Sequence, residues 1–290
     1  MWKPEQVVRD ITNGTIFERL QKQTRDEVTA IPQDELLEGV TALLKRPQAR
    51  NIPHIRTLSI PVLAAEYRDV FEALDLPGRL SAYEPCVGGS EPVIIATEAY
   101  SSGRANYLTV NLNRQLRAQL QGKISHLESS IRIVDDNAQH VLNYLKPNSV
   151  DAACFHHAIN DILQTAVSEP RGMDTATIDW WPNERQMIEW MAEDFESGLI
   201  EERGKKELME IIGDAAKLVR PGGYLIFDHW TFLGHKELDW FPWQLFCDLV
   251  PIARRWIMES SLPVAEVELP DADPQWWMFL RVENKPSAGL

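Results

Sequence analysis

The sequence predicts an α/β fold in which a mostly parallel sheet carries helices on both faces and follows a helical arm. From residue 79 onward, short apolar runs alternate with helical spacing. Such alternation is typical of right-handed crossovers between parallel strands. Residues 1 to about 76 carry helical spacing and no strand pattern. We therefore expect an N-terminal helical cap or arm over residues 1–78 and an α/β domain over residues 79–290.

Composition and charge narrow the class of protein. The 290 residues are 44% hydrophobic, and 43 acidic against 29 basic residues give a net charge of −14. A nucleic-acid partner favours a basic footprint, so the acidity favours a small-molecule partner and good solubility. Cys86, Cys154 and Cys247 form no Cys-x-x-Cys pair, which indicates neither a disulfide framework nor a zinc site. No signal peptide or membrane span is expected, so we predict a cytoplasmic protein.

The arm is expected to consist of helices. Residues 15–20 and 34–44 place apolar side chains on one helical face, and a further helix is expected from near Pro61 to before Pro77. Tyr67 on that last helix is the arm residue best placed to reach a site, although packing is the alternative. The arm could cap the site or form a homodimer, and the sequence leaves both open.

Strand and helix patterns alternate after the arm. Each strand candidate is a short apolar run, and each helical candidate has apolar residues at spacings of three and four. The strand candidates are residues 80–84, 107–111, 131–134, 150–155 and 224–227. The helical candidates between them are residues 92–100, 114–121, 138–145 and 205–219.

The last third of the chain departs from this alternation. Residues 255–258, 266–269 and 276–282 are short strand candidates with no room for crossover helices late in the chain. The turn residues at 270–274 favour an antiparallel hairpin at the edge of the sheet. Residues 168–204 form an insertion after the fourth strand, rich in Trp and acidic residues.

The segment Leu80-Ser-Ala-Tyr-Glu84-Pro-Cys86-Val-Gly88-Gly89-Ser90 carries the clearest functional pattern. An apolar strand ends at an acid, small residues follow, and a helix begins just after. Small residues let a backbone approach a ligand closely, and the helix N-terminus offers unpaired N–H groups. This arrangement suits a nucleoside-bearing ligand at the carboxyl edge of a parallel sheet, although an ordinary turn is the alternative.

Five motifs in order resemble the class I S-adenosylmethionine (SAM)-dependent methyltransferases. The most specific is Leu218-Val-Arg-Pro221-Gly222-Gly223-Tyr-Leu-Ile-Phe, which resembles the segment leading into the fifth strand of that family. The others are residues 84–90, 107–113, 131–138 and 150–157. The resemblance covers about residues 80–282 and implies a Rossmann-like seven-stranded sheet with an antiparallel edge strand, and SAM as the cofactor.

The resemblance also implies a set of cofactor-binding residues. Glu84 would receive the amino group of the cofactor, and the loop after it would lie against the methionine part. The ends of the second and third strands would meet the ribose and the adenine, and the end of the fourth strand would complete the site. The residues at these positions are Glu84, Cys86, Gly88, Gly89, Asn111, Asn113, Asp135, Asp136, Asn137, Phe155 and His156.

The chain departs from the family pattern at two places. Cys86 and Ser90 stand where glycine is usual, and both are small enough for close approach. Asn111 and Asn113 stand where an acid usually binds both ribose hydroxyls, and an amide can accept one hydroxyl and donate to the other. These departures leave two alternatives open: a SAM enzyme that transfers an aminocarboxypropyl group or cyclises SAM, and a non-catalytic binding protein.

His156 and His157 are the candidate general bases. We expect a helix to follow, in which His156 pairs with Asn160 and His157 with Asp161 at a spacing of four residues. A histidine held by a carboxylate is a suitable base near neutral pH. Helix capping is the alternative, and no metal site is expected because adjacent histidines point apart.

The acceptor site is expected to lie under the arm and the insertion. Trp180, Trp181 and Trp190 could form a lid or an aromatic box, although core packing is the alternative. Asp228, His229 and Trp230 end the fifth strand at the same edge, where they would line the acceptor pocket, although a simple strand terminus is the alternative. The sequence therefore predicts methyl transfer to O, N or C of a small molecule, without nucleic-acid or membrane partners.

Overall fold

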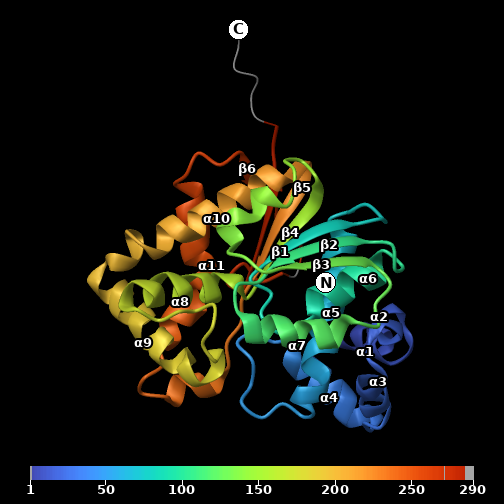
Figure 1. Ribbon diagram of the computed structural model, residues 1–290. Coiled ribbons are helices and arrows are strands. Elements are labelled where there is room, and N and C mark those ends of the chain that lie inside the picture. Colours follow the sequence, from blue (N-terminus) through green and yellow to red (C-terminus); the bar gives the residue numbers. More distant parts are fainter. Residues whose placement is uncertain (1, 271, 285–290) are drawn as a thin grey trace.

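A computed structural model describes residues 2–270 and 272–284 of the chain (Figure 1). Its centre is a seven-stranded sheet with the order β3-β2-β1-β4-β5-β7-β6. The first five strands are parallel, β7 is antiparallel to β5, and β6 is antiparallel to β7. The strands are β1 Ser81–Pro85, β2 Asn106–Val110, β3 Ser130–Val134, β4 Val150–His156, β5 Val219–Asp228, β6 Val264–Glu266 and β7 Trp277–Val282. The predicted fold class is confirmed.

Helices cover both faces of this sheet. The helices of the α/β part are α6 Pro92–Tyr100, α7 Arg114–Ile124, α8 Ala158–Ser168, α9 Trp180–Ser197, α10 Gly204–Leu218 and α11 Trp243–Met258. Short 3₁₀ helices are η1 Ala138–Asn143, η2 Glu169–Arg171, η3 Leu199–Glu201 and η4 Leu233–Glu237. In Figure 1, α8, α9 and α10 lie on the side of the sheet away from the N-terminal helices.

The N-terminal helices pack on one face of the sheet. They are α1 Pro4–Asn13, α2 Thr15–Arg19, α3 Lys22–Thr29, α4 Gln33–Leu43 and α5 Ile55–Ala73. Alternate residues of β4 separate the two faces: Ala152 and Cys154 join the core shared with the arm, whereas Ala153 and Phe155 join the core beneath α8, α10 and α11. This period of two follows from the pleat of a strand.

Two of the secondary-structure predictions are wrong. The strand predicted at residues 255–258 is wrong, because these residues form the last turn of α11. Residues 138–145 form the 3₁₀ helix η1 and a following turn, rather than an α-helix. Elsewhere the bounds shift by a few residues, as for β6, which was expected at 266–269. No helix among the described residues is both long and apolar enough to cross a bilayer.

Candidate active site

The carboxyl ends of β1, β4 and β5 open onto a cavity of about 590 Å³, which we call the main cavity. Five parts of the chain surround it: the β1–α6 loop, one side of α7, the end of β4 with the start of α8, the N-terminal half of α9, and the segment from the end of β5 to the start of α11. Its lining includes residues 86–90, Leu116, Gln119, Lys123, His156, His157, Asn160, Asp161, Trp180, Trp181, Glu184, Trp230, Phe232, His235, Trp240, Phe241 and Phe246. The cavity thus collects residues from distant parts of the sequence.

The loop of residues 86–90 keeps an open backbone surface toward this cavity. Gly88 has a φ of 60°, which glycine adopts without steric cost, and a Cβ there would meet only Leu116 Cδ1, at 4.0 Å. Two side chains that are not part of the loop fix its backbone: Asn111 Nδ2 donates to Gly88 O at 2.6 Å, and Lys123 Nζ donates to Gly89 O at 2.6 Å. A ligand could therefore approach the backbone at Gly88 closely.

Glu84 lies buried beneath the loop and does not line the main cavity. Tyr107 donates its hydroxyl to Oε2 of Glu84, and Oε1 has no hydrogen-bond partner among the described residues. Burial, together with the charge of Asp228, raises the pKa of Glu84 well above its usual range. Buried polar atoms are normally paired, so the unpartnered Oε1 is consistent with a partner that the chain itself does not supply.

The two asparagines after β2 have different surroundings. Asn113 caps α7 by accepting from the backbone of Gln115 and Leu116, and its Nδ2 donates to the carbonyls of Thr175 and Ile178. Its carboxamide is therefore fully used inside the chain. Asn111 donates one hydrogen bond to the loop and retains Oδ1 as an acceptor. Of the two, Asn111 is the better candidate to meet a ribose.

The residues after β3 lie outside the lining of the main cavity. Asp135 forms a bidentate ion pair with Arg117. Asp136 accepts from His140 and Tyr144, and these hydrogen bonds lower its pKa. Asn137 caps η1 by accepting from the backbone of Gln139 at 3.0 Å. Their predicted role at the adenine remains a prediction.

His156 is held by a carboxylate from the neighbouring strand. Its Nδ1 lies 2.9 Å and 3.1 Å from the two oxygens of Asp228, and Tyr67 donates its hydroxyl to the same carboxylate. Burial alone would raise the pKa of Asp228, but the charge and hydrogen bond of His156 outweigh it and the pKa is lowered. An ionised carboxylate only accepts, so Nδ1 carries the proton and Nε2 is the basic nitrogen.

The hydrogen-bond pairs predicted in the helix after β4 are wrong. His156 pairs with Asp228 rather than Asn160, and His157 Nε2 contacts the carbonyl of Trp230 at 3.0 Å rather than Asp161. Both predictions assumed a helix from residue 156, whereas α8 begins at Ala158 and His157 has a φ of 56°. Burial and the charge of His156 lower the pKa of His157 to about 4, so this imidazole is neutral at pH 7.

The remaining predicted residues near β4 and β5 lie deeper than expected. Phe155 stacks on Phe227 in the core, with ring centroids 4.4 Å apart. Tyr67, Asp228 and His229 are buried and do not line the main cavity. His229 packs against His157, and neither of its ring nitrogens has a hydrogen-bond partner among the described residues. Asp228 instead accepts from Nδ1 of His156, and Tyr67 donates to Asp228, so both residues help to fix the position of His156.

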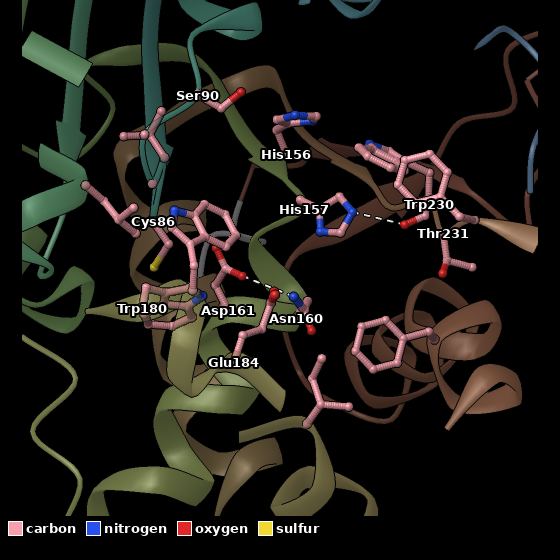
Figure 2. A pocket seen from close by; sticks show the side chains of 18 of the residues that line it. Cys86, Ser90, His156, His157, Asn160, Asp161, Trp180, Glu184, Trp230 and Thr231 are labelled. Carbon is pink, nitrogen blue, oxygen red and sulfur yellow. Dashed lines mark hydrogen bonds between the residues drawn. The ribbon is translucent and has the colours of Figure 1, made fainter. Parts of the chain in front are cut away.

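One wall of the main cavity combines acids with tryptophan. Figure 2 shows Cys86, Trp180, Asp161 and Glu184 on one side and His157 and Trp230 on the other. Asp161 accepts from Asn160 at 3.1 Å, and burial together with the charge of Glu184 raises its pKa to about 8. Burial also raises the pKa of Glu184.

The predicted tryptophans separate into two groups. Trp180 is buried, whereas Trp181 is 58% exposed, and both line the main cavity. Trp190 packs against Arg171, whose guanidinium carbon is 5.5 Å from the centre of the indole ring. The two at the start of α9 are therefore placed to contact a ligand.

Most of the far end of this cavity was not predicted from the sequence. Trp230, which was expected at the acceptor pocket, is joined there by Phe232, Trp240, Phe241 and Phe246, and these residues form an aromatic wall from the segment after β5 and the start of α11. The dense aromatic stretch at residues 240–246 was the available signal. Among the described residues, no set of three or more His, Cys, Asp or Glu side chains is placed to hold a metal ion.

Comparisons with known proteins support the fold at low sequence identity. No family model and no curated protein matches the sequence. The solved structure of PH0851 aligns over 76% of this chain with 12% identity and a TM-score of 0.50. The sheet order and this similarity establish the architecture. The fold is that of the class I SAM-dependent methyltransferases. The chain spans 45% of the length of PH0851.

Two further solved structures carry methyltransferase names. A Methanococcus maripaludis protein, assigned provisionally as a SAM-dependent methyltransferase, aligns over 80% of this chain and 90% of its own with 11% identity and a TM-score of 0.48. A SAM-dependent O-methyltransferase from Thermotoga maritima aligns over 77% of this chain and 66% of its own, with 8% identity and a TM-score of 0.42. Similarity this low leaves the activity of this chain to be argued from its own residues.

The residues of the main cavity, together with Glu84 and Asn111 behind the loop of residues 86–90, fit the cofactor that this methyltransferase fold implies. The open backbone at Gly88 and the unpartnered oxygen of Glu84 suit the amino-acid end of SAM. Asp161, Glu184 and Trp180 suit a positive charge, since carboxylates and indole faces both attract cations. The ribose would rely on Asn111.

Proposed function

We propose that this chain is a SAM-dependent methyltransferase that acts on a small-molecule acceptor. One observation carries the proposal: the open loop after β1 and His156, whose Nδ1 is held by Asp228, border the same cavity. At about 590 Å³ the cavity lies within the range of roughly 300–1,000 Å³ that is usual for small-ligand pockets.

Each residue then has a defined task. When bound, SAM supplies a methyl group on a positively charged sulfur. Gly88 permits close contact with the loop, and Glu84 and Asn111 offer acceptors. The carboxyl groups of Asp161 and Glu184, which a nearby cation would favour in their ionised form, balance positive charge. His156 accepts at Nε2 the proton that the nucleophilic atom of the acceptor gives up, and Asp228 stabilises the resulting imidazolium. Alignment of the reactants is expected to supply most of the acceleration.

A small acceptor is favoured over RNA. The chain carries a net charge of −14, and the main cavity is lined by two carboxylates and several aromatic side chains. Binding to a nucleic-acid backbone depends on lysine and arginine contacts. The methylated atom, whether O, N or C, depends on the acceptor.

Calorimetry with SAM and S-adenosylhomocysteine tests the cofactor. Gly88→Val should abolish detectable binding, because a branched side chain at this position would occupy the space beside the loop in which we place the cofactor. Gly172→Val is the matched control: Gly172 also has a positive φ, 85°, with no atom near its absent Cβ, but it lies outside the cavity. Both substitutions carry a similar backbone cost of about 1–3 kcal/mol. Equal binding by Gly88→Val and the control, or no binding by the wild-type chain at millimolar cofactor, would contradict the proposal.

Product analysis separates methyl transfer from other SAM chemistry. Mass spectrometry of reactions with methyl-labelled SAM and a library of small metabolites should find S-adenosylhomocysteine with a labelled acceptor. Methylthioadenosine as the main product would instead indicate aminocarboxypropyl transfer or cyclisation.

A further inference from the structure

A second cavity of about 310 Å³ lies between the N-terminal arm and the ends of β4 and β5. We call it the arm cavity. Its arm side is formed by Gln48, Ile55, Arg56, Ser59, Ile60 and Leu63, and its other side by Ser90, His156, Trp230 and Phe232. These last four residues also line the main cavity. His156 therefore borders two cavities at once, with its Nδ1 fixed on Asp228.

The arm cavity has an apolar body and a single cation. Ile55, Ile60 and Leu63 line it together with the shared aromatic residues. Arg56 is exposed and makes no ion pair within 4.0 Å with any residue that the structure describes. The indole N–H of Trp230 is buried and has no hydrogen-bond partner among those residues. A guanidinium and an N–H group both donate, so they suit a ligand that carries acceptor oxygens.

The main cavity presents carboxyl groups and no unpaired lysine or arginine among its lining residues. Asp161 and Glu184 line it, and neither forms an ion pair within the described part of the chain. The pKa of Asp161 is about 8, so this group is mostly protonated at pH 7, and a bound cation would favour its ionised form. Its one lysine, Lys123, is already paired with Glu91 at 3.1 Å. His157 is neutral at pH 7, since its pKa is about 4. The two cavities therefore suit two different ligands, one with a positive charge and one with a negative charge.

We propose that the arm cavity binds the methyl acceptor, and that the acceptor is a small apolar molecule with a carboxylate or similar anionic group held by Arg56. This inference rests on the proposed function and assigns the main cavity to the cofactor. Direct displacement requires two reactants to meet in line, and two cavities that share His156 and Ser90 provide such a meeting point. The arm then contributes specificity through α5.

Three probes of nearly equal size and different charge test the site: benzoate, benzyl alcohol and benzylamine. Calorimetry on the full chain, with and without saturating S-adenosylhomocysteine, should show benzoate binding most tightly and equally well in both conditions. Competition between benzoate and S-adenosylhomocysteine would place both in one cavity and overturn the proposal. So would a preference for benzylamine, or no binding of any probe.

Substitutions in the arm cavity test whether benzoate binds there. Arg56→Gln should weaken benzoate by roughly 10-fold to 100-fold, as for the loss of a charged hydrogen-bond partner, and leave benzyl alcohol unchanged. Ile60→Trp should fill the arm cavity and remove benzoate binding while S-adenosylhomocysteine still binds. Arg79→Gln and Ile31→Trp, at an exposed arginine and a half-buried isoleucine outside both cavities, are the matched controls.

Two results distinguish failure of this proposal from failure of the proposed function. If S-adenosylhomocysteine binds but benzoate binding survives both Arg56→Gln and Ile60→Trp, only the acceptor site is wrong. If benzoate responds to both variants but the chain ignores SAM and S-adenosylhomocysteine, the anion site stands, whereas the cofactor assignment and the acceptor role that rests on it both fail.

Discussion

Asp228 and His156 form the chemically most specific contact in the molecule. The carboxylate is buried, lies 2.9 Å from Nδ1 of His156, and also accepts from Tyr67. Burial raises the pKa of Tyr67 well above its usual value, so the phenol keeps its proton and remains a donor. Two donors from different elements thus fix one carboxylate, which in turn fixes the tautomer of the proposed base.

Replacing Asp228 tests this arrangement. In Asp228→Ala, His156 should lose its single tautomer, because no acceptor remains for the proton on Nδ1. Nitrogen NMR of the imidazole reports the tautomer without any acceptor molecule. Methyl transfer should fall by roughly 10²–10⁴-fold, the usual contribution of acid–base catalysis. Tyr67→Phe, which leaves the carboxylate in place, is the control and should keep the tautomer. An unchanged tautomer in Asp228→Ala would show that Asp228 does not position His156.

The pH dependence of stability should report the half-buried Asp161. Its pKa is about 8 in the folded chain, against about 3.9 for an ordinary aspartate. Between these values the folded state binds more protons at this site than the unfolded state, so its contribution to stability falls as pH rises from about 4 to about 8. Glu184 and Cys86 face the same site.

Asp161→Asn should remove this slope. The melting temperature of the wild-type chain should decline relative to that of the variant between pH 5 and pH 8. Differential scanning calorimetry at matched ionic strength measures the difference. Glu207, whose pKa is raised to about 7 mainly by burial, titrates in both proteins and cancels in the comparison. Parallel curves for the two proteins would contradict the assignment.

At the scale of elements, one side chain ties the insertion to the sheet. Asn113 caps α7 and also donates to the carbonyls of Thr175 and Ile178 at 2.9 Å and 3.0 Å. Arg114 N adds a backbone hydrogen bond to the carbonyl of Ala176. The segment that leads into α9, and with it Trp180 and Glu184, is positioned by these contacts.

Asn113→Ala should therefore do more than remove a cap. Loss of an N-cap costs about 0.5–2 kcal/mol, which urea denaturation can measure. Hydrogen exchange should also rise in residues 175–180. Asn137→Ala is the matched control, since Asn137 caps η1 with one hydrogen bond to Gln139 N. If exchange near residue 178 is the same in both variants, Asn113 does not hold the insertion.

The elements themselves could mostly be predicted from the sequence. The α6 prediction matches the observed Pro92–Tyr100, and the parallel strands fall within a few residues of their predicted places. The failure at residues 255–258 has a local cause. Pro251 lies inside α11, and a proline disfavours the prediction of a helix from sequence. The spacing of the buried residues nevertheless fits one helical face: Phe246, Leu249, Val250, Ala253 and Ile257.

At the scale of the whole molecule, the arm and the α/β part share one core. Side chains of α1, α4 and α5 belong to the same apolar cluster as Ala82, Cys154 and Trp277. Arg46 pairs with Glu66 at 2.7 Å and lies 5.2 Å from the ring centre of Trp277 in β7. The arm thus contacts the sheet through a buried ion pair and an aromatic cluster.

Removing one partner of the buried ion pair should destabilise the chain more than replacing both partners with apolar residues. Glu66→Gln leaves the Arg46 charge without its partner and should destabilise the chain by about 3–5 kcal/mol. The double variant Arg46→Met with Glu66→Leu should be less destabilised than the single variant, because no unpaired charge remains. Urea unfolding followed by tryptophan fluorescence and by circular dichroism tests both. A double variant less stable than Glu66→Gln would contradict this view of the pair.

Local spacing determined the order of the five parallel strands, the loop at residues 84–90 and the cluster of polar residues at the strand ends. These features depend on neighbours a few positions apart, which the sequence displays directly. Only the tertiary structure decided which side chains meet. Asp228 contacts His156 across 72 positions and Tyr67 across 161, and such contacts depend on strand register and helix packing. The same long-range packing places the arm beside His156 and creates the second cavity there.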